Sequence, residues 1–411
     1  MTEQFVVIGA GEAGARAAVA LRENGFAGAI SLIGDEIHLP YERPPLSKAV
    51  LTGEGEPSPP HILDEARLAA HGVTHLHGTA ATAIERAGHL VLLAGRDPLR
   101  YDRLLIATGA RARRLAVPGA GPDTVHYLRN FAEALTLRRR LHAGHRLVVI
   151  GGGFIGLELA AAAVARGAVV TVIEMAPRLL GRAVPAEIAS VIAARHEAAG
   201  VRILVGATID RIETDADGSH RVILGSGEAV AADTIIAGVG ALPETTLAEQ
   251  AGLALDNGIA ADAYLATSDP DIFTAGDCCS FPHALYGGRR IRLEAWRNAQ
   301  DQGTAVAKSM LGAGEPYAAV PWFWSDHYEL TLQIAGLADE GTETVTRDAG
   351  DGARIDFHRA ADGRLVAVSA VGPNGRIAKD VRLAEMLIAR RAAPAAAELA
   401  DASVKLKSLM V

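Results

Sequence analysis

One pattern occurs twice in this chain of 411 residues and constrains its fold more than any other feature. Each copy is a run of β-branched residues, a Gly-x-Gly-x-x-Gly segment and an alanine-rich stretch, which predicts a strand, a tight turn and a helix. Such a turn allows close approach of a pyrophosphate to a helix N-terminus. The repeat therefore predicts two dinucleotide-binding domains. The glycines are Gly9, Gly11 and Gly14 in the first copy and Gly151, Gly153 and Gly156 in the second.

An acidic residue follows the next predicted strand in each copy. Asp35 lies 21 residues past Gly14, and Glu174 lies 18 residues past Gly156. A carboxylate at this place can accept hydrogen bonds from an adenosine ribose. Two sites suggest two different dinucleotides, although one copy could be a structural duplicate without a ligand.

Glu174 also indicates which nicotinamide dinucleotide is used. A carboxylate accepts a hydrogen bond from the ribose 2′-OH of NADH and repels the 2′-phosphate of NADPH, so NADH is favoured. Arg178 and Arg182 lie just downstream and could in principle meet a phosphate, but solvated charges or contacts to the pyrophosphate are the preferred interpretation.

Composition and charge exclude several classes. Hydrophobic residues make up 49% of the chain and charged residues 21%, which suits a globular protein of two or three domains. The net charge of -8 argues against a nucleic-acid binder. The start of the sequence lacks the pattern of a signal peptide, so cytoplasmic residence is expected. The apolar run from Leu147 to Ala165 is interrupted by three glycines and predicts a buried strand, turn and helix rather than a membrane span.

The cysteines and histidines predict no metal site. Cys278 and Cys279 are the only cysteines and cannot form a Cys-x-x-Cys pair or an iron–sulfur ligand set, so two small packed thiols are expected. His75 and His77 fit one face of a short strand, which we expect to be solvated, and His71 adds no further ligand set.

A charged residue within an apolar helix needs a partner. Glu158 lies two residues past the second turn in an otherwise apolar stretch, and buried carboxylates are costly unless paired. Lys48 follows the rigid Pro44-Pro45 turn and is the predicted partner. If one of the two dinucleotides is FAD, a cation near its flavin ring would stabilise the reduced, anionic form.

Five blocks together resemble a known family. They begin at Val7, Arg43, Gly151, Thr274 and Pro321, and end at Gly11, Lys48, Glu158, Asp277 and Asp326. The chain is similar to the FAD-dependent ferredoxin reductases of bacterial oxygenase systems, of the putidaredoxin reductase and biphenyl dioxygenase ferredoxin reductase type, within the glutathione-reductase-like flavoproteins. The segment from Ala370 to Asp380 departs from the family pattern.

The resemblance implies a set of site residues. Lys48, Glu158, Pro45 and Trp324 would act at the flavin. The FAD-binding residues would be Gly9, Gly11, Ala13, Gly14, Asp35, Arg43, Lys48, Ala81, Thr108, Gly109, Arg129, Gly276, Asp277, Ala295 and Trp296. The NAD-binding residues would be Gly151, Gly153, Phe154, Ile155, Gly156, Glu158, Glu174, Arg182, Gly238, Val239 and Gly240.

The expected architecture is α/β, with two Rossmann-like domains of glutathione-reductase type and a C-terminal α+β domain. The predicted limits are 1–111 and 243–320 for an FAD-binding domain in two segments, 112–242 for the NAD-binding domain and 321–411 for the C-terminal domain.

The resemblance further implies a function. A hydride would pass from NADH to FAD, and single electrons would pass to a [2Fe-2S] ferredoxin that serves a cytochrome P450 or a ring-hydroxylating dioxygenase. The chain would act as a monomer or weak homodimer. An acidic ferredoxin could dock on a cluster of basic residues. An equally good interpretation is that these residues form a solvated loop. The cluster comprises Arg289, Arg290, Arg292 and Arg297.

Alternatives remain within and outside this class. Rubredoxin reductase and monodehydroascorbate reductase share most of the blocks. An apoptosis-inducing-factor-like flavoprotein with a binding role would want a basic surface and a targeting segment, and the sequence shows neither.

Overall fold

The computed structural model describes residues 3–181 and 184–410. The chain divides into two compact units. Unit 1 comprises residues 1–42, 59–111 and 242–321, and unit 2 comprises residues 43–58, 112–241 and 322–411. Residues 43–58 thus join the unit that contains both the predicted NAD-binding segment and the predicted C-terminal domain. The predicted domain limits themselves remain predictions.

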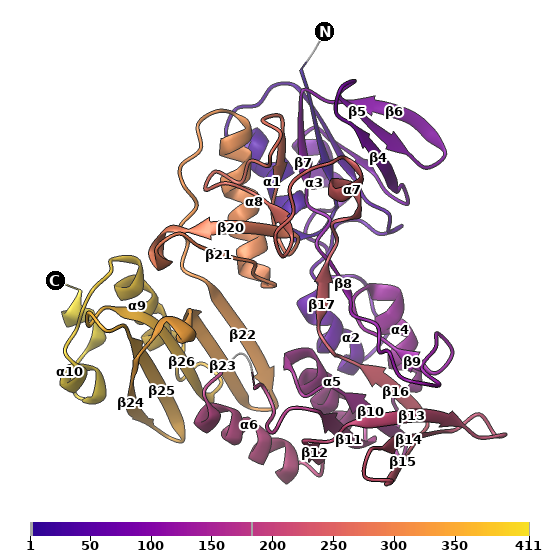
Figure 1. Cartoon of the computed structure of the whole chain (residues 1–411), viewed down its shortest axis with the longest axis vertical. Coiled ribbons are helices and arrows are strands. Elements are labelled where there is room, and N and C mark those ends of the chain that lie inside the picture. The colour runs from indigo at the N-terminus through magenta and orange to yellow at the C-terminus, as the bar shows by residue number, and fades with distance from the viewer. Residues whose placement is uncertain (1–2, 182–183, 411) are drawn as a thin grey trace. The chain divides into compact units, whose positions relative to one another are not determined.

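A five-stranded parallel sheet forms the centre of unit 1 (Figure 1). Its order is β19-β7-β1-β2-β3, and its strands are β1 (Gln4–Ile8), β2 (Ala29–Ile33), β3 (Val73–Leu76), β7 (Arg103–Ile106) and β19 (Ile272–Thr274). Ile8 pairs with Ile33 and Ile106, so these strands end at the same edge. Segments that follow them, including the first glycine turn, are therefore brought together there.

Helices and small sheets cover the two faces of this parallel sheet. Helices α1 (Glu12–Glu23) and α8 (Trp296–Met310) pack together so closely that a Cβ at Gly303 would lie 2.6 Å from the Ala13 carbonyl oxygen. On the other face, Ile8, Ile33 and Ile106 pack with Val91 of β5. The remaining elements of unit 1 are α3 (Glu65–Ala70), β4 (Ala81–Glu85), β5 (Leu90–Leu93), β6 (Arg96–Arg100), α7 (Thr246–Gln250), β18 (Ile259–Ala260), β20 (Cys279–His283), η2 (Ala284–Tyr286) and β21 (Arg289–Ile291).

Unit 2 contains a second parallel sheet, in the order β12-β11-β10-β16-β9. Its strands are β9 (Val125–His126), β10 (Arg146–Ile150), β11 (Val169–Glu174), β12 (Arg202–Val205) and β16 (Thr234–Ala237), and its helices are α4 (Phe131–Arg140), α5 (Phe154–Ala165) and α6 (Ala186–Ala198). Strands β13 (Ile209–Thr214), β14 (His220–Leu224) and β15 (Ala229–Ala232) form an antiparallel sheet. The short strands β8 (Ala110–Ala112) and β17 (Ala241–Pro243) lie where the chain passes between the units.

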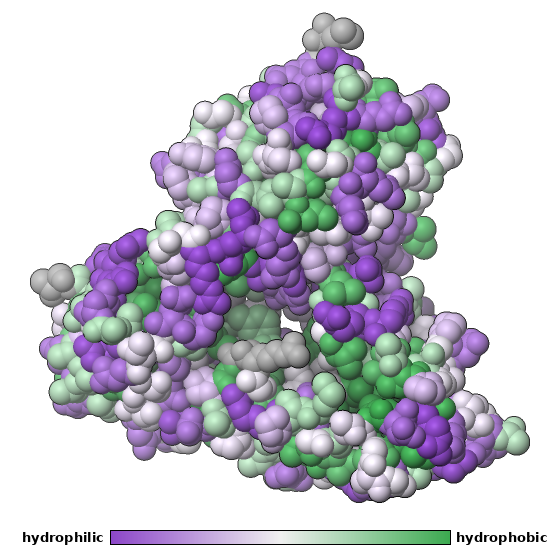
Figure 2. Space-filling model, viewed as in Figure 1, coloured by the Kyte–Doolittle hydropathy of each residue, from purple (hydrophilic) through white to green (hydrophobic). Residues whose placement is uncertain are grey.

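The run from Leu147 to Ala165 forms β10, a glycine turn and α5, as predicted. Within residues 3–181 and 184–410, no helix combines the length and apolarity needed to cross a membrane. Figure 2 shows hydrophilic residues over much of the visible surface of each unit.

The C-terminal part of unit 2 is a five-stranded antiparallel sheet with helices packed on it, which confirms the predicted α+β class (Figure 1). Its order is β22-β23-β26-β25-β24. The elements are β22 (Trp322–His327), β23 (Leu330–Gly336), η3 (Ala338–Glu340), β24 (Glu343–Gly350), β25 (Ala353–Arg359), β26 (Leu365–Pro373), α9 (Ala378–Ala389), α10 (Ala396–Ala400) and η4 (Leu406–Leu409).

The segment 43–58 begins with the 3₁₀ turn η1 (Pro44–Ser47), in which proline fixes the first backbone angles, and continues into α2 (Ala49–Thr52). Arg138 of α4 holds this segment, because its Nη1 donates to the Val50 carbonyl at 2.8 Å and its Nη2 to that of Gly53 at 2.7 Å. Lys48, between η1 and α2, is thereby placed within unit 2.

Candidate functional site

The three glycines of the first turn have separate roles. Gly9 has φ +107°, and a Cβ there would lie 2.1 Å from the Ala107 carbonyl oxygen. A Cβ at Gly14 would lie 1.9 Å from the Gly9 carbonyl oxygen, whereas one at Gly11 would meet nothing within 4 Å. Gly11 is the N-cap of α1 and makes no side-chain cap bond. Gly9 and Gly14 therefore serve packing, and Gly11 leaves room and free N–H groups for an anion.

A second turn at the same sheet edge carries Asp277. Gly276 has φ +83° and donates its N–H to Gln302 Oε1 at 2.7 Å. A Cβ on Gly276 would lie 3.0 Å from the Cβ of Ala13 on α1, so Ala13 and Gly276 are neighbours as the predicted set requires. The Asp277 carbonyl accepts a hydrogen bond from Arg292 Nη1 at 3.1 Å.

The other predicted FAD residues of unit 1 lie near the ends of strands or at a helix start. Asp35 is exposed directly after β2, Ala81 opens β4, and Gly109, with φ +72°, follows β7. Thr108 Oγ1 donates to the Glu244 carbonyl at 2.6 Å, which ties this edge to a later segment. Ala295 is the N-cap of α8 and Trp296 its first residue.

His75 corrects an expectation. It lies on β3 beside Gly34, with its Nε2 3.5 Å from the position of a Gly34 Cβ, and both ring nitrogens are buried without a hydrogen-bond partner among the described residues. Burial, followed by the neighbouring His77, lowers the pKa of His75 to about 4. The solvated-face prediction was therefore wrong for the ring nitrogens of His75, which are buried beside Gly34, although His77 is exposed.

Glu12 lies between Gly11 and Gly14 in the first turn. It was not among the predicted site residues, because the turn pattern is defined by its glycines alone. Burial, followed by the charge of Glu42, raises the pKa of Glu12 to about 7, while Gln300 and Trp296 act in the opposite direction.

The second turn repeats the geometry of the first. A Cβ on Gly151, which has φ +107°, would lie 2.4 Å from the Gly238 carbonyl oxygen, and one on Gly156 would lie 2.1 Å from that of Gly151. Gly153 has open space and is the N-cap of α5 without a side-chain cap bond. As in the first turn, two glycines, Gly151 and Gly156, allow close packing, and Gly153 leaves open space. Gly238 is the residue against which Gly151 packs.

Glu174 is held firmly at the end of β11. Its Oε2 accepts from the Gly152 N–H and its Oε1 from the Ala176 N–H, both at 2.7 Å. The carboxylate therefore lies against the second glycine turn, where it could accept hydrogen bonds from the hydroxyls of a bound ribose. Arg178 donates to the carbonyls of Leu179, Gly181 and Val184, so local bonds account for it, and Arg182 lies outside the described residues.

The remaining NAD residues surround this turn. Phe154 packs its ring 4.3 Å from that of Phe323, and Ile155 is 48% exposed. Gly238 donates its N–H to the Ile150 carbonyl at 2.7 Å, and the Gly240 carbonyl accepts from the Arg113 N–H at 2.9 Å, with Val239 between them.

The predicted partnership of Lys48 and Glu158 is present. Lys48 Nζ lies 3.2 Å from Glu158 Oε1, and the Glu158 side chain is 8% exposed. Ser47 Oγ and Ser325 Oγ each donate to this carboxylate at 2.6 Å. Three donors thus offset the cost of burying the charge.

Strand β22 completes what we call the Lys48 cluster: Ser47, Lys48, Glu158, Trp324, Ser325 and Asp326. Lys48 Nζ also lies 3.2 Å from Asp326 Oδ2 and 5.2 Å from the ring centre of Trp324. Trp324 stacks on Trp322 at 5.4 Å between ring centres. The roles of Ser325 and Asp326 were not anticipated from the sequence, although both lie in a block that carried the family resemblance.

Arg43 and Arg129 lie next to this segment in unit 2. Arg43 Nη1 donates to the Arg129 carbonyl at 2.6 Å, and the Arg129 N–H donates to Glu133 Oε2 at 2.7 Å. Pro45 accepts the Lys48 N–H at 3.1 Å. The two arginines are thus adjacent, as a shared contact to one cofactor requires.

Comparison of the chain with models of known protein families identifies its family. The pyridine nucleotide-disulphide oxidoreductase family model matches residues 3–303, and the reductase C-terminal model matches residues 322–410. The chain belongs to the pyridine nucleotide-disulphide oxidoreductase family. It is therefore an oxidoreductase that uses FAD and a nicotinamide dinucleotide.

Full-length relatives support the assignment to this family. The ferredoxin–NAD(+) reductase component of the anthranilate 1,2-dioxygenase system of Burkholderia cepacia is 40% identical over 99% of both chains. The rubredoxin–NAD(+) reductase of Pseudomonas putida is 38% identical over 89% of this chain and 95% of its own.

Solved structures of the family agree in fold along the whole chain. A ferredoxin reductase from Rhodopseudomonas palustris has a TM-score of 0.94 at 37% identity and covers 100% of both chains. The reductase of the covalent putidaredoxin reductase–putidaredoxin complex has a TM-score of 0.92 at 36% identity, over 99% of this chain and 98% of that chain.

The residues present fit the two dinucleotides of this oxidoreductase family. The uncapped starts of α1 and α5, each with an open glycine, can receive pyrophosphates. Ile155, on α5, is 48% exposed and Met175, directly after Glu174, is 71% exposed, and both offer apolar surface for an adenine ring. The bound FAD would supply the conversion between hydride and single-electron transfer.

The thiol chemistry in the family name has no basis in this chain. Cys278 and Cys279 are free and buried, as predicted. Burial raises the pKa of both thiols, so neither is ionised at neutral pH. Within the described residues no group of three or more His, Cys, Asp or Glu side chains could hold a metal ion.

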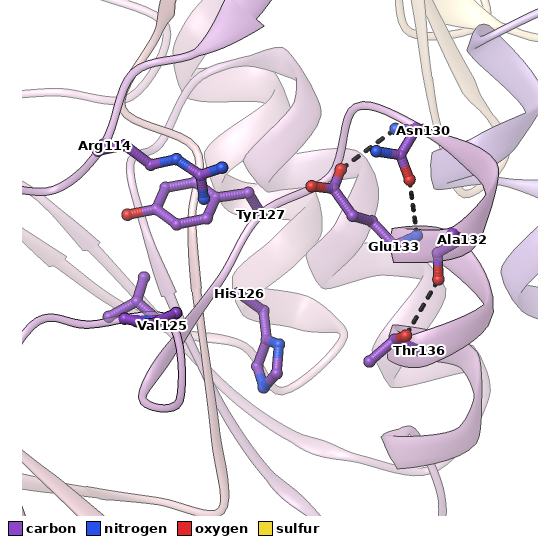
Figure 3. A pocket seen from close by; sticks show the side chains of 9 residues that line it. Arg114, Val125, His126, Tyr127, Asn130, Ala132, Glu133 and Thr136 are labelled. Carbon is purple, nitrogen blue, oxygen red and sulfur yellow. Dashed lines mark hydrogen bonds between the residues drawn. The ribbon is translucent and has the colours of Figure 1, made fainter. Parts of the chain in front are cut away.

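A pocket of unit 2 lies beside Arg129, whose N–H bonds the lining residue Glu133 (Figure 3). It has a volume of about 340 Å³, and Arg114, lying 4.2 Å from the ring centre of Tyr127, lines it together with His126. Glu133 and Asn130, which also line it, form the capping box of α4. None of the predicted site residues lines this pocket, and two of its polar residues, Asn130 and Glu133, already serve helix capping.

Proposed function

We propose that this oxidoreductase transfers a hydride from NADH to FAD and passes single electrons to a [2Fe-2S] ferredoxin that serves a cytochrome P450 or a ring-hydroxylating dioxygenase. The observation that carries the proposal is the joint presence of two glycine turns, the Lys48–Glu158 pair and a C-terminal domain, in one chain without a Cys-x-x-Cys pair. The relatives named for ferredoxin support the choice of acceptor.

In this proposal several predicted residues have a defined task. Gly11 and Asp35 hold the pyrophosphate and ribose of FAD, Asp277 holds its ribityl chain, and Arg129, with Arg43 beside it, contacts its phosphates or ribose. Gly153 and Glu174 hold the pyrophosphate and ribose of NADH. Lys48 offers a positive charge to the flavin, and Trp324 covers its edge. Cytoplasmic residence and a monomeric or weakly dimeric state belong to the same proposal.

Anaerobic mixing of the purified protein with NADH tests this function. NADH should bleach the flavin absorbance, and oxidised [2Fe-2S] ferredoxin should restore it within milliseconds to seconds. A flavin that NADH reduces but ferredoxin fails to reoxidise would contradict the proposed acceptor. The similarity to a rubredoxin–NAD(+) reductase makes rubredoxin the second candidate acceptor.

NADH should be used at least about a hundredfold more efficiently than NADPH. The fixed Glu174 carboxylate repels a 2′-phosphate, and a like-charge contact of about 3 kcal/mol corresponds to that ratio. In E174Q the ratio of kcat/KM values for the two cofactors should narrow at least tenfold while flavin content stays constant. An unchanged ratio in E174Q would refute this role.

Arg289 and Arg290 are the exposed members of the proposed ferredoxin dock. Arg292 is only 11% exposed and bonds the Asp277 carbonyl, so its replacement would disturb the FAD turn. The variant R289A/R290A should raise the KM for ferredoxin about tenfold and weaken its dependence on salt, because steering by two charges is lost.

The matched control for the dock is R211A/R221A, which removes the same charge from the exposed β13–β14 hairpin. Its ferredoxin kinetics should stay at the parental value. If R289A/R290A and R211A/R221A show the same KM for ferredoxin and the same salt dependence, these arginines do not form the ferredoxin dock.

A further inference from the structure

Lys48 is bonded to two carboxylates of different character. Glu158, on α5, is 8% exposed and accepts from two serine hydroxyls as well as from Lys48. Asp326, on β22, is 39% exposed and bonds the same ammonium at the same distance, 3.2 Å. The pair expected from the sequence is therefore a triad with a formal charge of -1.

Asp326 is itself fixed in place. Thr331 Oγ1, on the paired strand β23, donates to Asp326 Oδ1 at 3.0 Å, and Trp324 Nε1 donates to Oδ2 at 3.2 Å. The oxygen that bonds Lys48 is thus also the one that accepts from the Trp324 indole. One carboxylate oxygen therefore sets the positions of the ammonium and of the aromatic ring together.

We propose that Asp326 is a positioning residue of the redox site, which holds Lys48 and Trp324 in register and sets the charge that the flavin meets. The inference rests on the proposed function, in which Lys48 and Trp324 lie at the flavin. Glu158 is enclosed by donors and anchors Lys48 from within unit 2, whereas the more exposed Asp326 adjusts the balance of charge.

The physical consequence concerns flavin reduction. A reduced flavin carries additional negative charge, so a nearby carboxylate opposes reduction and a nearby ammonium favours it. Asp326 partly cancels the ammonium of Lys48. Its neutralisation should therefore make the flavin easier to reduce, and the loss of Lys48 should do the opposite.

The test is the midpoint potential of the bound FAD, measured by equilibration with a reference dye in the FAD-loaded protein without NADH or an acceptor. In D326N the potential should rise by about 30 mV, which is a tenfold change in a two-electron equilibrium. D326E, which keeps the charge, should restore most of the parental value. A residue that serves only the fold would not give this pattern.

E329Q is the matched control, since Glu329 lies on the same β22–β23 hairpin, bonds Arg195 and loses one charge in the same way. Its potential should equal the parental one. Urea unfolding of each variant checks that the fold is intact, and if D326N unfolds, D326S, which removes the same charge with a smaller side chain and should show the same rise in potential, replaces it in the comparison.

Equal potentials in D326N, E329Q and the parent protein would overturn the inference. The readout involves no ferredoxin, so failure of the inference is distinguishable from failure of the proposed function. A protein that reduces rubredoxin but not ferredoxin, and still shows the D326N shift, would contradict only the acceptor.

Discussion

Replacing Gly14 by alanine should destabilise the protein even without FAD, whereas replacing Gly11 by alanine should weaken FAD binding and leave the fold intact. A Cβ at position 14 would lie 1.9 Å from the Gly9 carbonyl oxygen, and neither group is a flexible side-chain end. Overpacking of this kind costs about 3 kcal/mol. At position 11 the backbone has φ -80° and the space is open, so alanine fits until a pyrophosphate must approach.

Two measurements separate these effects. Urea unfolding of the apo-protein should place G14A about 3 kcal/mol below the parent and G11A within about 0.5 kcal/mol of it. FAD titration should show G11A binding at least tenfold more weakly. An apo-form of G14A as stable as the parent would show that the close contact between Gly9 and α1 relaxes without cost.

The protein should lose stability steeply in mild acid because two histidines are buried side by side. His196 of α6 and His327 of β22 are both 0% exposed, and His196 Nε2 lies 3.4 Å from His327 Nδ1. Burial, then Arg195, lowers the pKa of His196 to about 4, and burial, then His196, lowers that of His327 to about 3.

The direction follows from proton uptake. Above about pH 6.5 both histidines are neutral in the folded and unfolded chains, so they add no pH dependence. As the pH falls below 6.5, the unfolded chain takes up protons that the folded pair refuses until about pH 4 and pH 3. Each histidine then lowers the free energy of unfolding by about 1.4 kcal/mol per pH unit, and the pair by several kcal/mol near pH 4.5.

Chemical unfolding between pH 7.5 and pH 4.5 measures this loss. The double variant H196L/H327L should show a flatter decline, with nearly two fewer protons taken up on unfolding. H142L, which replaces an exposed histidine of unit 2, should decline as the parent does. A parental slope in H196L/H327L would mean that the pair does not stay neutral in the folded protein.

Local patterns carried most of what could be predicted. The turns at Gly9 and Gly151 follow from a strand, a fixed glycine spacing and a helix within one short segment, so the sequence alone indicates them. Lys48 and Glu158 are 110 residues apart, but a carboxylate within an apolar helix demands a partner and the rigid turn before Lys48 singled out the lysine.

Contacts that depend on how distant elements pack against each other could not be predicted from the sequence. Ser325 and Glu158 are 167 residues apart, and their hydrogen bond depends on how β22 lies against α5. The same holds for Asp326 with Lys48 and for His196 with His327. His75 shows a different limit: strand alternation placed it on the same face as His77, but its ring nitrogens are buried beside Gly34, a contact that alternation does not reveal.

The central claim is tested most directly by steady-state turnover of the purified FAD-containing protein with NADH against three acceptors: a [2Fe-2S] ferredoxin, rubredoxin and monodehydroascorbate. The proposal predicts the highest kcat/KM with ferredoxin, at least tenfold above either other acceptor. Rapid turnover only with rubredoxin or monodehydroascorbate, and none with ferredoxin, would contradict it.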